Sequence, residues 1–253
     1  MKLYEYIEIL KLTKTTLKEY ENWGEIEIYK LVNKNDNSVT DILQTSKQQF
    51  PFSEILNSKK KLDKLKEEVL SCKKCSLGET RLNAVFGTGA LDAGLMFVGE
   101  GPGYDEDHKG EPFIGRAGQL LTKIIEAMGR TRKNVYIANI VKCHPMIDSA
   151  DPQKRANDRP PTFEEMKICR FYLDMQLEII KPKIIVALGA SSTKGLLNNK
   201  EPISKIRGTV REYNGIKLMP TYHPAALLRN PNLKKLVWED MKKVMYFLDT
   251  GKI

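Results

Sequence analysis

Four cysteines are the residues of this chain whose type and spacing point most directly to chemistry. Cys72 and Cys75 form a CxxC pair, and Cys143 and Cys169 follow far along the chain. Thiolates at the CxxC spacing can hold one metal centre, and four of them suit either tetrahedral zinc or a 4Fe-4S cluster. A redox-active CxxC pair with two buried structural cysteines is the alternative. The spacing favours a metal centre over that alternative.

Three polar residues that could act on a substrate each lie at or just beyond the end of a short apolar run. They are Glu100, Asn139 and His223. Glu100 lies in a stretch, residues 99–118, that holds six glycines and two prolines in twenty residues. Such a density allows tight turns and close backbone approach to a ligand. The stretch matches neither a Walker loop nor the GxGxxG pattern.

The elements that must position these residues alternate along the chain from about residue 62. The expected strands are residues 95–98, 135–141, 183–189 and 216–219, and amphipathic helices are expected at 118–128, 166–180 and 233–248. Continuously apolar strands alternating with helices predict a parallel sheet covered by helices. In such sheets the active site lies beyond the carboxyl ends of the strands, where all three polar candidates are placed.

Composition separates the chain into two predicted parts. Residues 1–60 hold nine lysines and nine acidic residues, whereas residues 61–253 hold 32 basic and 23 acidic residues and thus carry the whole net charge of +9. We expect an N-terminal extension over 1–60 and one domain over 61–253, and only the latter should meet a polyanion. A solvated, lysine-rich surface is the alternative. No apolar run approaches a membrane span, so a cytoplasmic protein without membrane contact is expected.

Four features of the sequence carry a resemblance to a known family. The first motif is Gly99-Glu-Gly-Pro-Gly103 with Glu106-Asp107 and Gly110-Glu-Pro-Phe-Ile-Gly115, the second is Asn139-Ile-Val-Lys-Cys143, and the closing motif is Tyr222-His-Pro-Ala-Ala-Leu-Leu-Arg229. With the four cysteines, and in this order, they resemble the family 4 (iron–sulfur) uracil-DNA glycosylases over roughly residues 62–249. The resemblance implies a three-layer αβα sandwich with a central, mostly parallel four-stranded sheet. It also implies a 4Fe-4S cluster on the four cysteines, with structural zinc as the alternative.

The implied reaction is hydrolysis of the bond between uracil and deoxyribose in DNA. By resemblance, Glu100 orients or activates the water and His223 hydrogen-bonds the leaving base. Asn139 reads uracil, Phe113 stacks on the flipped base, and Glu106 crowds out the methyl group of thymine. Gly101 lies where other uracil glycosylases carry an aspartate. The plainer interpretations are an exposed acid for Glu106, a core ring for Phe113, a polar break in a strand for Asn139 and a structural histidine for His223.

The resemblance also implies residues that contact DNA. Leu227 aligns with the leucine that fills the gap left by the flipped nucleotide; Leu228 and a core-facing helix start are alternatives. Arg229 follows them, and Gly87 and Gly89 would let the backbone approach a phosphate. An insertion at about 146–156 sets the chain apart from the family. In and beside it, Lys154, Arg155 and Arg159 are candidates for backbone contacts, although a solvated loop fits them nearly as well.

Two functional classes compete. The first is a monofunctional uracil-DNA glycosylase that acts as a monomer on uracil-containing DNA at the nucleoid. The second is a non-catalytic DNA-binding or damage-sensing protein that keeps the fold and cluster. The joint presence of Glu100, Phe113, Asn139 and His223 favours the enzyme. A protein partner held through residues 1–60 is compatible with either class.

Overall fold

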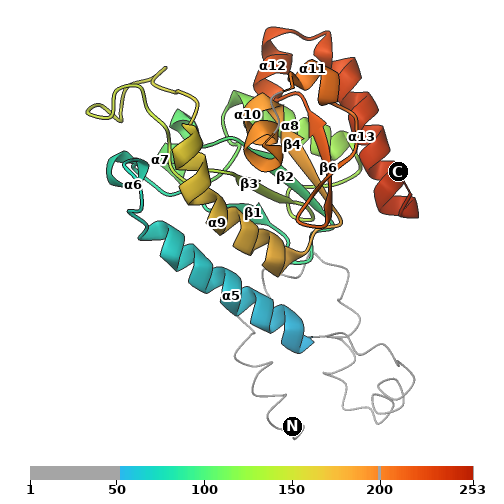
Figure 1. Cartoon of the computed structure of the whole chain (residues 1–253), viewed down its shortest axis with the longest axis horizontal. Coiled ribbons are helices and arrows are strands. Elements are labelled where there is room, and N and C mark those ends of the chain that lie inside the picture. The colour runs from blue at the N-terminus through green and yellow to red at the C-terminus, as the bar shows by residue number, and fades with distance from the viewer. Residues whose placement is uncertain (1–51, 199–200, 253) are drawn as a thin grey trace, which may run out of the picture. The chain divides into compact units, whose positions relative to one another are not determined.

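The computed structural model describes residues 52–198 and 201–252 (Figure 1). Phe52–Ile253 forms one compact unit. The expectations for residues 1–51 lie outside the described part of the chain. No helix in that part is both long and apolar enough to cross a membrane.

The central sheet has six strands in the order β1-β3-β2-β4-β6-β5. Their bounds are β1 Thr88–Gly89, β2 Leu95–Gly99, β3 Tyr136–Asn139, β4 Ile184–Leu188, β5 Arg211–Tyr213 and β6 Ile216–Thr221. The four inner strands are parallel to one another, and β1 and β5 pair antiparallel at the two edges. The four predicted strands are confirmed as this inner group. The predicted number of four is wrong, since the sheet has six strands. The two edge strands were not predicted because they are only two and three residues long and carry no apolar run.

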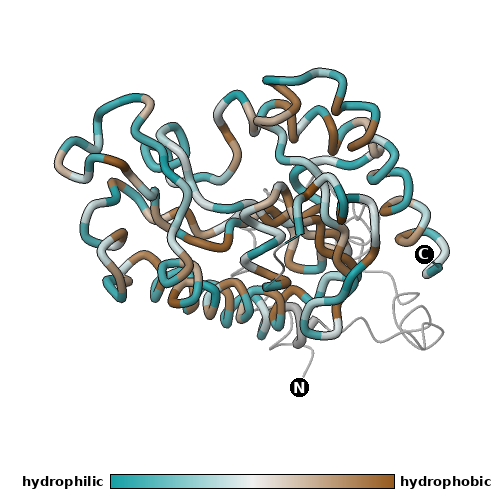
Figure 2. The backbone as a smooth tube through the Cα atoms, turned by 45° about the horizontal axis from the view of Figure 1, so that its top comes forward, coloured by the Kyte–Doolittle hydropathy of each residue, from teal (hydrophilic) through white to brown (hydrophobic). Residues whose placement is uncertain are grey.

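Apolar side chains cover both faces of the sheet. Met96 and Val98 of β2 belong to one buried cluster, and Leu95 and Phe97 belong to the other, as the two-residue period of a strand requires. Helices α5 (Phe52–Leu70) and α9 (Phe163–Ile180) contribute to the first cluster, and α8 (Arg116–Ala127) and α13 (Leu233–Thr250) to the second. Figure 2 shows the hydrophobic segments gathered at the strands, with hydrophilic residues on the outer loops and helix faces.

Short helices follow the carboxyl ends of the inner strands. They are α7 (Tyr104–Lys109) and then α8 after β2, α10 (Gly189–Leu197) after β4, and α12 (Pro224–Arg229) after β6. The remaining short helices are α6 (Leu77–Thr80) and α11 (Ile203–Ile206). Pro224 at the first position of α12 fixes the backbone angle there, so this helix starts directly after His223.

Helix α5 runs without a break across the predicted boundary between residues 60 and 61. Leu65 and Val69 on this helix are buried against α9, and the two helices lie side by side in Figure 1. Pairing of these apolar faces explains why the helix belongs to the compact unit. The role of the N-terminal extension stays a prediction.

Candidate active site

Residues far apart in the sequence meet at the carboxyl edge of the sheet. Gly99 pairs with Asn139 across β2 and β3. A methyl group placed on Gly99 would overlap both the Asn139 side chain and the Phe113 ring. The Phe113 ring centre lies 5.7 Å from that of His223. The structure therefore brings Asn139, Phe113 and His223 together.

Two oxygen atoms in this region are buried and have no hydrogen-bond partner among the described residues. They are Oε1 of Glu100 and Oδ1 of Asn139. Asn139 is only 2% exposed, at the last position of β3. A buried polar atom without a partner is costly, so native proteins keep few of them. A ligand or an ordered water would supply the hydrogen bond that each atom lacks.

Glu100 follows directly on β2, and its side chain hydrogen-bonds Ser191 at the start of α10. Burial raises the pKa of Glu100, and the Ser191 hydrogen bond opposes that rise without cancelling it. A carboxylate with a raised pKa is a stronger base toward a water molecule. The Glu100 carboxylate is thus positioned jointly by the end of β2, which carries it, and by the helix after β4, which carries Ser191.

His223 caps α12 through its imidazole. Its Nδ1 accepts a hydrogen bond from the backbone N–H of Ala225 at 3.1 Å. Burial, together with the positive charge of Arg229, lowers the pKa of His223 to about 4. The ring is therefore neutral near pH 7. Because Nδ1 accepts, the single proton lies on Nε2, which can donate to a ligand.

Phe113 is buried at 7% exposure and has a backbone φ of 53°. Few residues other than glycine adopt this left-handed conformation. Its carbonyl accepts a hydrogen bond from Arg132 Nη1 at 3.1 Å. The neighbouring Pro112 carbonyl accepts one from Arg132 Nη2 at 2.6 Å.

Glu106 and Gly101 lie in the same glycine-rich stretch, but their contacts within the protein are structural. The Glu106 carboxylate accepts hydrogen bonds from the backbone N–H groups of Gly103, Ile114 and Gly115 at 2.9 to 3.2 Å. A side chain on Gly101 would meet the Val141 methyl group at 2.6 Å. This close contact gives a packing reason for glycine at position 101.

Lys142 is buried at 1% exposure, behind Asn139. Its ammonium donates to the Asn139 carbonyl at 2.8 Å and to Gln176 Oε1 at 2.6 Å. Burial lowers the pKa of Lys142 to about 8. Gln176 in turn donates to the Phe86 carbonyl at 2.9 Å. Lys142 thereby ties the end of β3 to helix α9.

The four cysteines line one pocket at the ends of α5, β3 and α9. All four are free thiols: Cys72, Cys75, Cys143 and Cys169. Arg81 donates to the Cys143 sulfur at 2.9 Å, and the backbone N–H of Lys142 donates to the Cys169 sulfur at 3.3 Å. Within residues 52–198 and 201–252, no three potential metal ligands are grouped closely enough to form a ready coordination shell.

The donor set nevertheless fits a thiolate-bound metal centre. Four cysteines line one pocket, and a guanidinium and a backbone amide already donate to the sulfur atoms of two of them, as hydrogen bonds to cluster sulfurs do. Burial raises the pKa of Cys143 to about 12 and raises that of Cys169. Buried neutral thiols become ligands when a bound metal takes the place of their protons.

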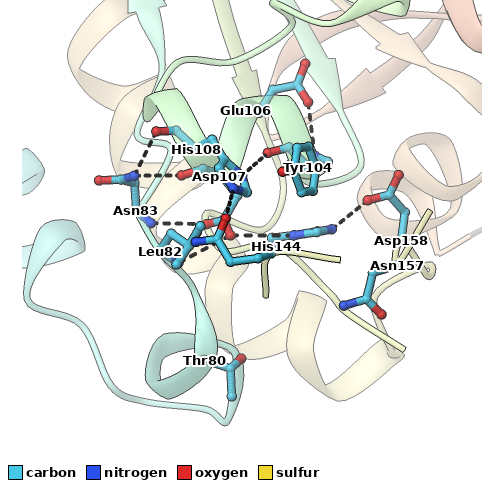
Figure 3. Close-up of polar contacts among 12 residues, drawn as sticks. Thr80, Leu82, Asn83, Tyr104, Glu106, Asp107, His108, His144, Asn157 and Asp158 are labelled. Atoms are coloured by element: carbon cyan, nitrogen blue, oxygen red, sulfur yellow. Dashed lines mark hydrogen bonds and ion pairs between the residues drawn. The ribbon is translucent and has the colours of Figure 1, made fainter. Parts of the chain in front are cut away.

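His144, next to Cys143, is buried at the centre of a polar network (Figure 3). Its Nε2 lies 2.6 Å from Asp158 Oδ1, and its Nδ1 lies 3.6 Å from Asp107 Oδ2. Burial alone would lower the pKa of His144, but the two carboxylates outweigh burial and raise it to about 9. Asp107 also accepts the backbone N–H groups of Leu82 and Asn83. The network joins α7 to the segments before and after it.

Three of the four basic residues predicted to contact DNA lie exposed on the surface, and Arg159 is partly buried. Lys154, Arg155 and Arg229 are exposed. Arg155 lies 3.9 Å from Asp105 and over the Tyr104 ring. Arg159, in contrast, forms two hydrogen bonds to Glu165 at the start of α9.

Two further predictions of DNA contacts, for the glycines at 87 and 89 and for Leu227, concern residues that the fold itself explains. Gly87 and Gly89 have φ values of 143° and 136°, and a side chain on Gly89 would overlap the Val135 carbonyl. Backbone geometry is therefore sufficient reason for both glycines. Leu227 is 1% exposed and lies in the core cluster with α13, whereas Leu228 is 42% exposed. This burial is at odds with the wedge role predicted for Leu227.

Three residues that hold the site in place were not predicted from the sequence: Ser191, Arg132 and Lys142. Lys142 lies within the second motif, only three residues after Asn139, which was the one available signal. Arg132 and Ser191 lie outside the quoted motifs. Arg132 contacts backbone carbonyls and Ser191 acts through a single hydroxyl. Contacts of these kinds leave no recognisable pattern of residue types in the sequence.

Comparison with known proteins identifies the family of this chain. The family model described as "Uracil DNA glycosylase superfamily" matches residues 86–242. A type-4 uracil-DNA glycosylase of Sulfurisphaera tokodaii is 48% identical over 200 residues, which cover 76% of this chain and 86% of the relative. Type-4 enzymes of Thermotoga maritima and Saccharolobus solfataricus are each 44% identical, over 72% and 76% of this chain and 92% and 88% of the relatives. The chain therefore belongs to the uracil DNA glycosylase superfamily, among its type-4 members.

Proposed function

We infer that this protein is a uracil-DNA glycosylase that hydrolyses the N-glycosidic bond of deoxyuridine in DNA, releasing uracil and leaving an abasic site. The observation that carries the inference is the meeting of Asn139, Phe113 and His223 at the sheet edge where Glu100 follows β2, with oxygens of Glu100 and Asn139 unpartnered among the described residues. The type-4 relatives support the same reaction.

Recognition begins with a base taken out of the DNA stack, because the glycosidic bond is inaccessible inside a duplex. The Phe113 ring offers a stacking surface for that base. Asn139 carries an amide with one acceptor and two donors, which suits the N3-H and O4 of uracil. Lys142 holds the backbone of Asn139 from behind, so the amide meets the base in one orientation.

Bond cleavage leaves negative charge on uracil and positive charge on the sugar. The neutral His223 donates from Nε2 toward O2 of the departing base, where the negative charge develops. The Glu100 carboxylate, steadied by Ser191, positions and polarises the water that attacks the sugar. Its negative charge also favours the cationic sugar.

The four cysteines are the proposed ligands of a 4Fe-4S cluster, with structural zinc as the alternative. Bound there, the group would order the cysteine-bearing segments of α5, α9 and the chain after β3. Hydrolysis requires no electron transfer, so the catalytic steps fall to the chain's own residues. The pocket lined by all four cysteines supports this assignment.

The surface proposals follow from exposure and charge. Leu228 is the better candidate for the residue that fills the gap in the DNA, because it is exposed and Leu227 is not. Lys154, Arg155 and Arg229 would contact phosphates. The three-layer arrangement, the monomeric state, action at the nucleoid and a partner for residues 1–60 belong to the same proposal. The apolar clusters on both sheet faces support the first of these.

The direct test is cleavage of a single-stranded oligonucleotide with one uracil, incubated with full-length, cluster-loaded protein and then treated with alkali. We expect strand scission at uracil and an intact thymine control. Binding of the oligonucleotide without any scission would instead support the non-catalytic DNA-binding protein. Brown protein that contains iron would favour the iron–sulfur cluster, and a colourless preparation that contains zinc alone would contradict it.

A further inference from the structure

The turn that carries Phe113 has an unfavourable backbone conformation at a functional position. Within residues 99–118, Phe113 is the one residue other than glycine whose φ lies in the left-handed region, at 53°. Such conformations persist only when the surrounding structure over-determines them. The contacts that hold this turn therefore decide where the ring lies.

Arg132 holds the carbonyl side of the turn. Its Nη2 donates to the Pro112 carbonyl at 2.6 Å, and its Nη1 donates to the Phe113 carbonyl at 3.1 Å. Nη1 also lies 3.5 Å from the Thr122 hydroxyl on α8. A planar guanidinium can bond two adjacent carbonyls at once, which a lysine ammonium cannot do with the same geometry.

Glu106 holds the amide side of the same turn. Its Oε1 accepts from the N–H groups of Ile114 at 2.9 Å and Gly115 at 3.0 Å. Its Oε2 accepts from Gly103 at 3.2 Å, near the loop that carries Glu100. Hydrogen bonds with an ionised partner are roughly twice as strong as neutral ones. Opposite charges thus fix the two sides of the Phe113 peptide.

The space around the turn leaves little freedom. A methyl group on Gly118 would overlap the Phe113 backbone, and one on Gly99 would overlap its ring. The ring therefore lies directly over Gly99, beside the Asn139 side chain. A small shift of the turn would move the ring relative to the amide that reads the base.

We propose that Arg132 is a positioning residue that, with Glu106, clamps the 112–115 turn so that the Phe113 ring meets the extruded uracil. This inference rests on the stacking role given to Phe113 under the proposed function. The Glu106 carboxylate is part of this clamp, because both of its oxygens accept hydrogen bonds from backbone amides.

The test measures inhibition of excision by free uracil, which reports binding of the base without DNA. In the full-length, cluster-loaded protein, Arg132→Gln should raise the inhibition constant of uracil roughly tenfold, within the range of one lost base–aromatic stack. Arg132→Lys should recover only part of this loss, since it keeps the charge but not the fork. Lys133→Gln removes an exposed positive charge one residue away and should leave the constant unchanged.

A double-mutant cycle with Phe113→Leu separates the clamp from a general structural effect. Phe113→Leu alone should weaken uracil binding, and adding Arg132→Gln should then cost less than about twofold more, because the two residues act through one contact. An equal loss from Arg132→Gln with and without Phe113 would overturn the clamp. Unchanged uracil inhibition in Phe113→Leu would overturn the stacking role itself, and the clamp with it. If Arg132→Gln does not fold, the same cycle with Arg132→Lys decides the question.

Discussion

Two carboxylates with buried oxygens lie close to the carboxyl end of the sheet, and they are bonded in opposite ways. Asp240 on α13 is fully buried, and both of its oxygens have donors: Arg207 bonds both oxygens, and Thr221 donates to Oδ2 at 2.6 Å. Glu100 has one buried oxygen without a partner in the described chain. Thr221 ends β6 only two residues before His223, so the Asp240 contacts border the candidate site.

The difference indicates what each region is for. A buried polar atom with all its partners stabilises the fold, whereas an unpartnered one is costly unless a ligand or water completes it. The Asp240 network, defined as Asp240, Arg207 and Thr221, holds β6 against α13. The site at the Glu100 end keeps unpaired oxygens and a strained Phe113 turn. Proteins accept such local costs where they serve function.

The largest expected effect is on catalysis at the unpartnered carboxylate. Glu100→Gln keeps the shape but removes the base, so excision of uracil should slow by roughly a hundredfold to ten-thousandfold. Single-turnover rates on a uracil oligonucleotide measure this, and the unfolding midpoint in urea should stay close to that of the wild type. A near-normal rate would mean that the water is activated elsewhere.

The fully bonded carboxylate should show the reverse pattern. Asp240→Ala leaves Arg207 without its partner and should lower the free energy of unfolding by about 3 to 5 kcal/mol. Excision per folded molecule should change little. Asp249→Ala makes the same change at an exposed position of the same helix and should cost less than about 0.5 kcal/mol. If Asp240→Ala lost activity but not stability, Asp240 would serve catalysis like Glu100, and the proposed difference between the two regions would be wrong.

The lowered pKa of His223 predicts that the candidate site makes the free energy of unfolding depend on pH. Its pKa is lowered from 6.5 to about 4 in the folded protein. The unfolded chain therefore binds the extra proton between these values, and the stability due to His223 is complete above pH 6.5 and lost as pH falls toward 4. The unfolding free energy of His223→Gln should fall less steeply than that of the wild type over this interval. Parallel curves for the two proteins would show that His223 keeps an ordinary pKa.

The smallest expected effect concerns the exposed charges near the site. Lys154→Gln with Arg155→Gln should weaken DNA binding several-fold, and the slope of log affinity against log salt should fall by about one for each lost phosphate contact. Lys242→Gln, an exposed residue of α13, serves as the control. An unchanged salt slope in the double variant would assign the insertion a role other than phosphate contact.

The sequence predicted the parts of this molecule that depend on apolar patterns. The inner strands and helices α8, α9 and α13 are runs of apolar residues with clear periods, so they could be located. Strands β1 and β5 could not, because two or three residues at an edge are held by pairing with a neighbour and carry no period of their own.

The residues proposed for the candidate site come from sequence motifs, whereas the residues that support them could not be predicted. Motif order identified Glu100, Asn139 and His223, and parallel strands place their ends at one edge. Burial of Lys142 ran against the expectation that lysine lies at the surface. Leu227 and Leu228 differ by one helical step of about 100°, which decides exposure but leaves no mark in the residue types.

The central claim is that Glu100, Asn139, Phe113 and His223 surround one extruded uracil. A crystal structure of the full-length protein soaked with free uracil tests it most directly. We expect the base to stack on Phe113, with Asn139 bonded to N3 and O4 and with His223 Nε2 bonded to O2. Uracil bound elsewhere, or a ring of Phe113 that the base does not touch, would contradict it.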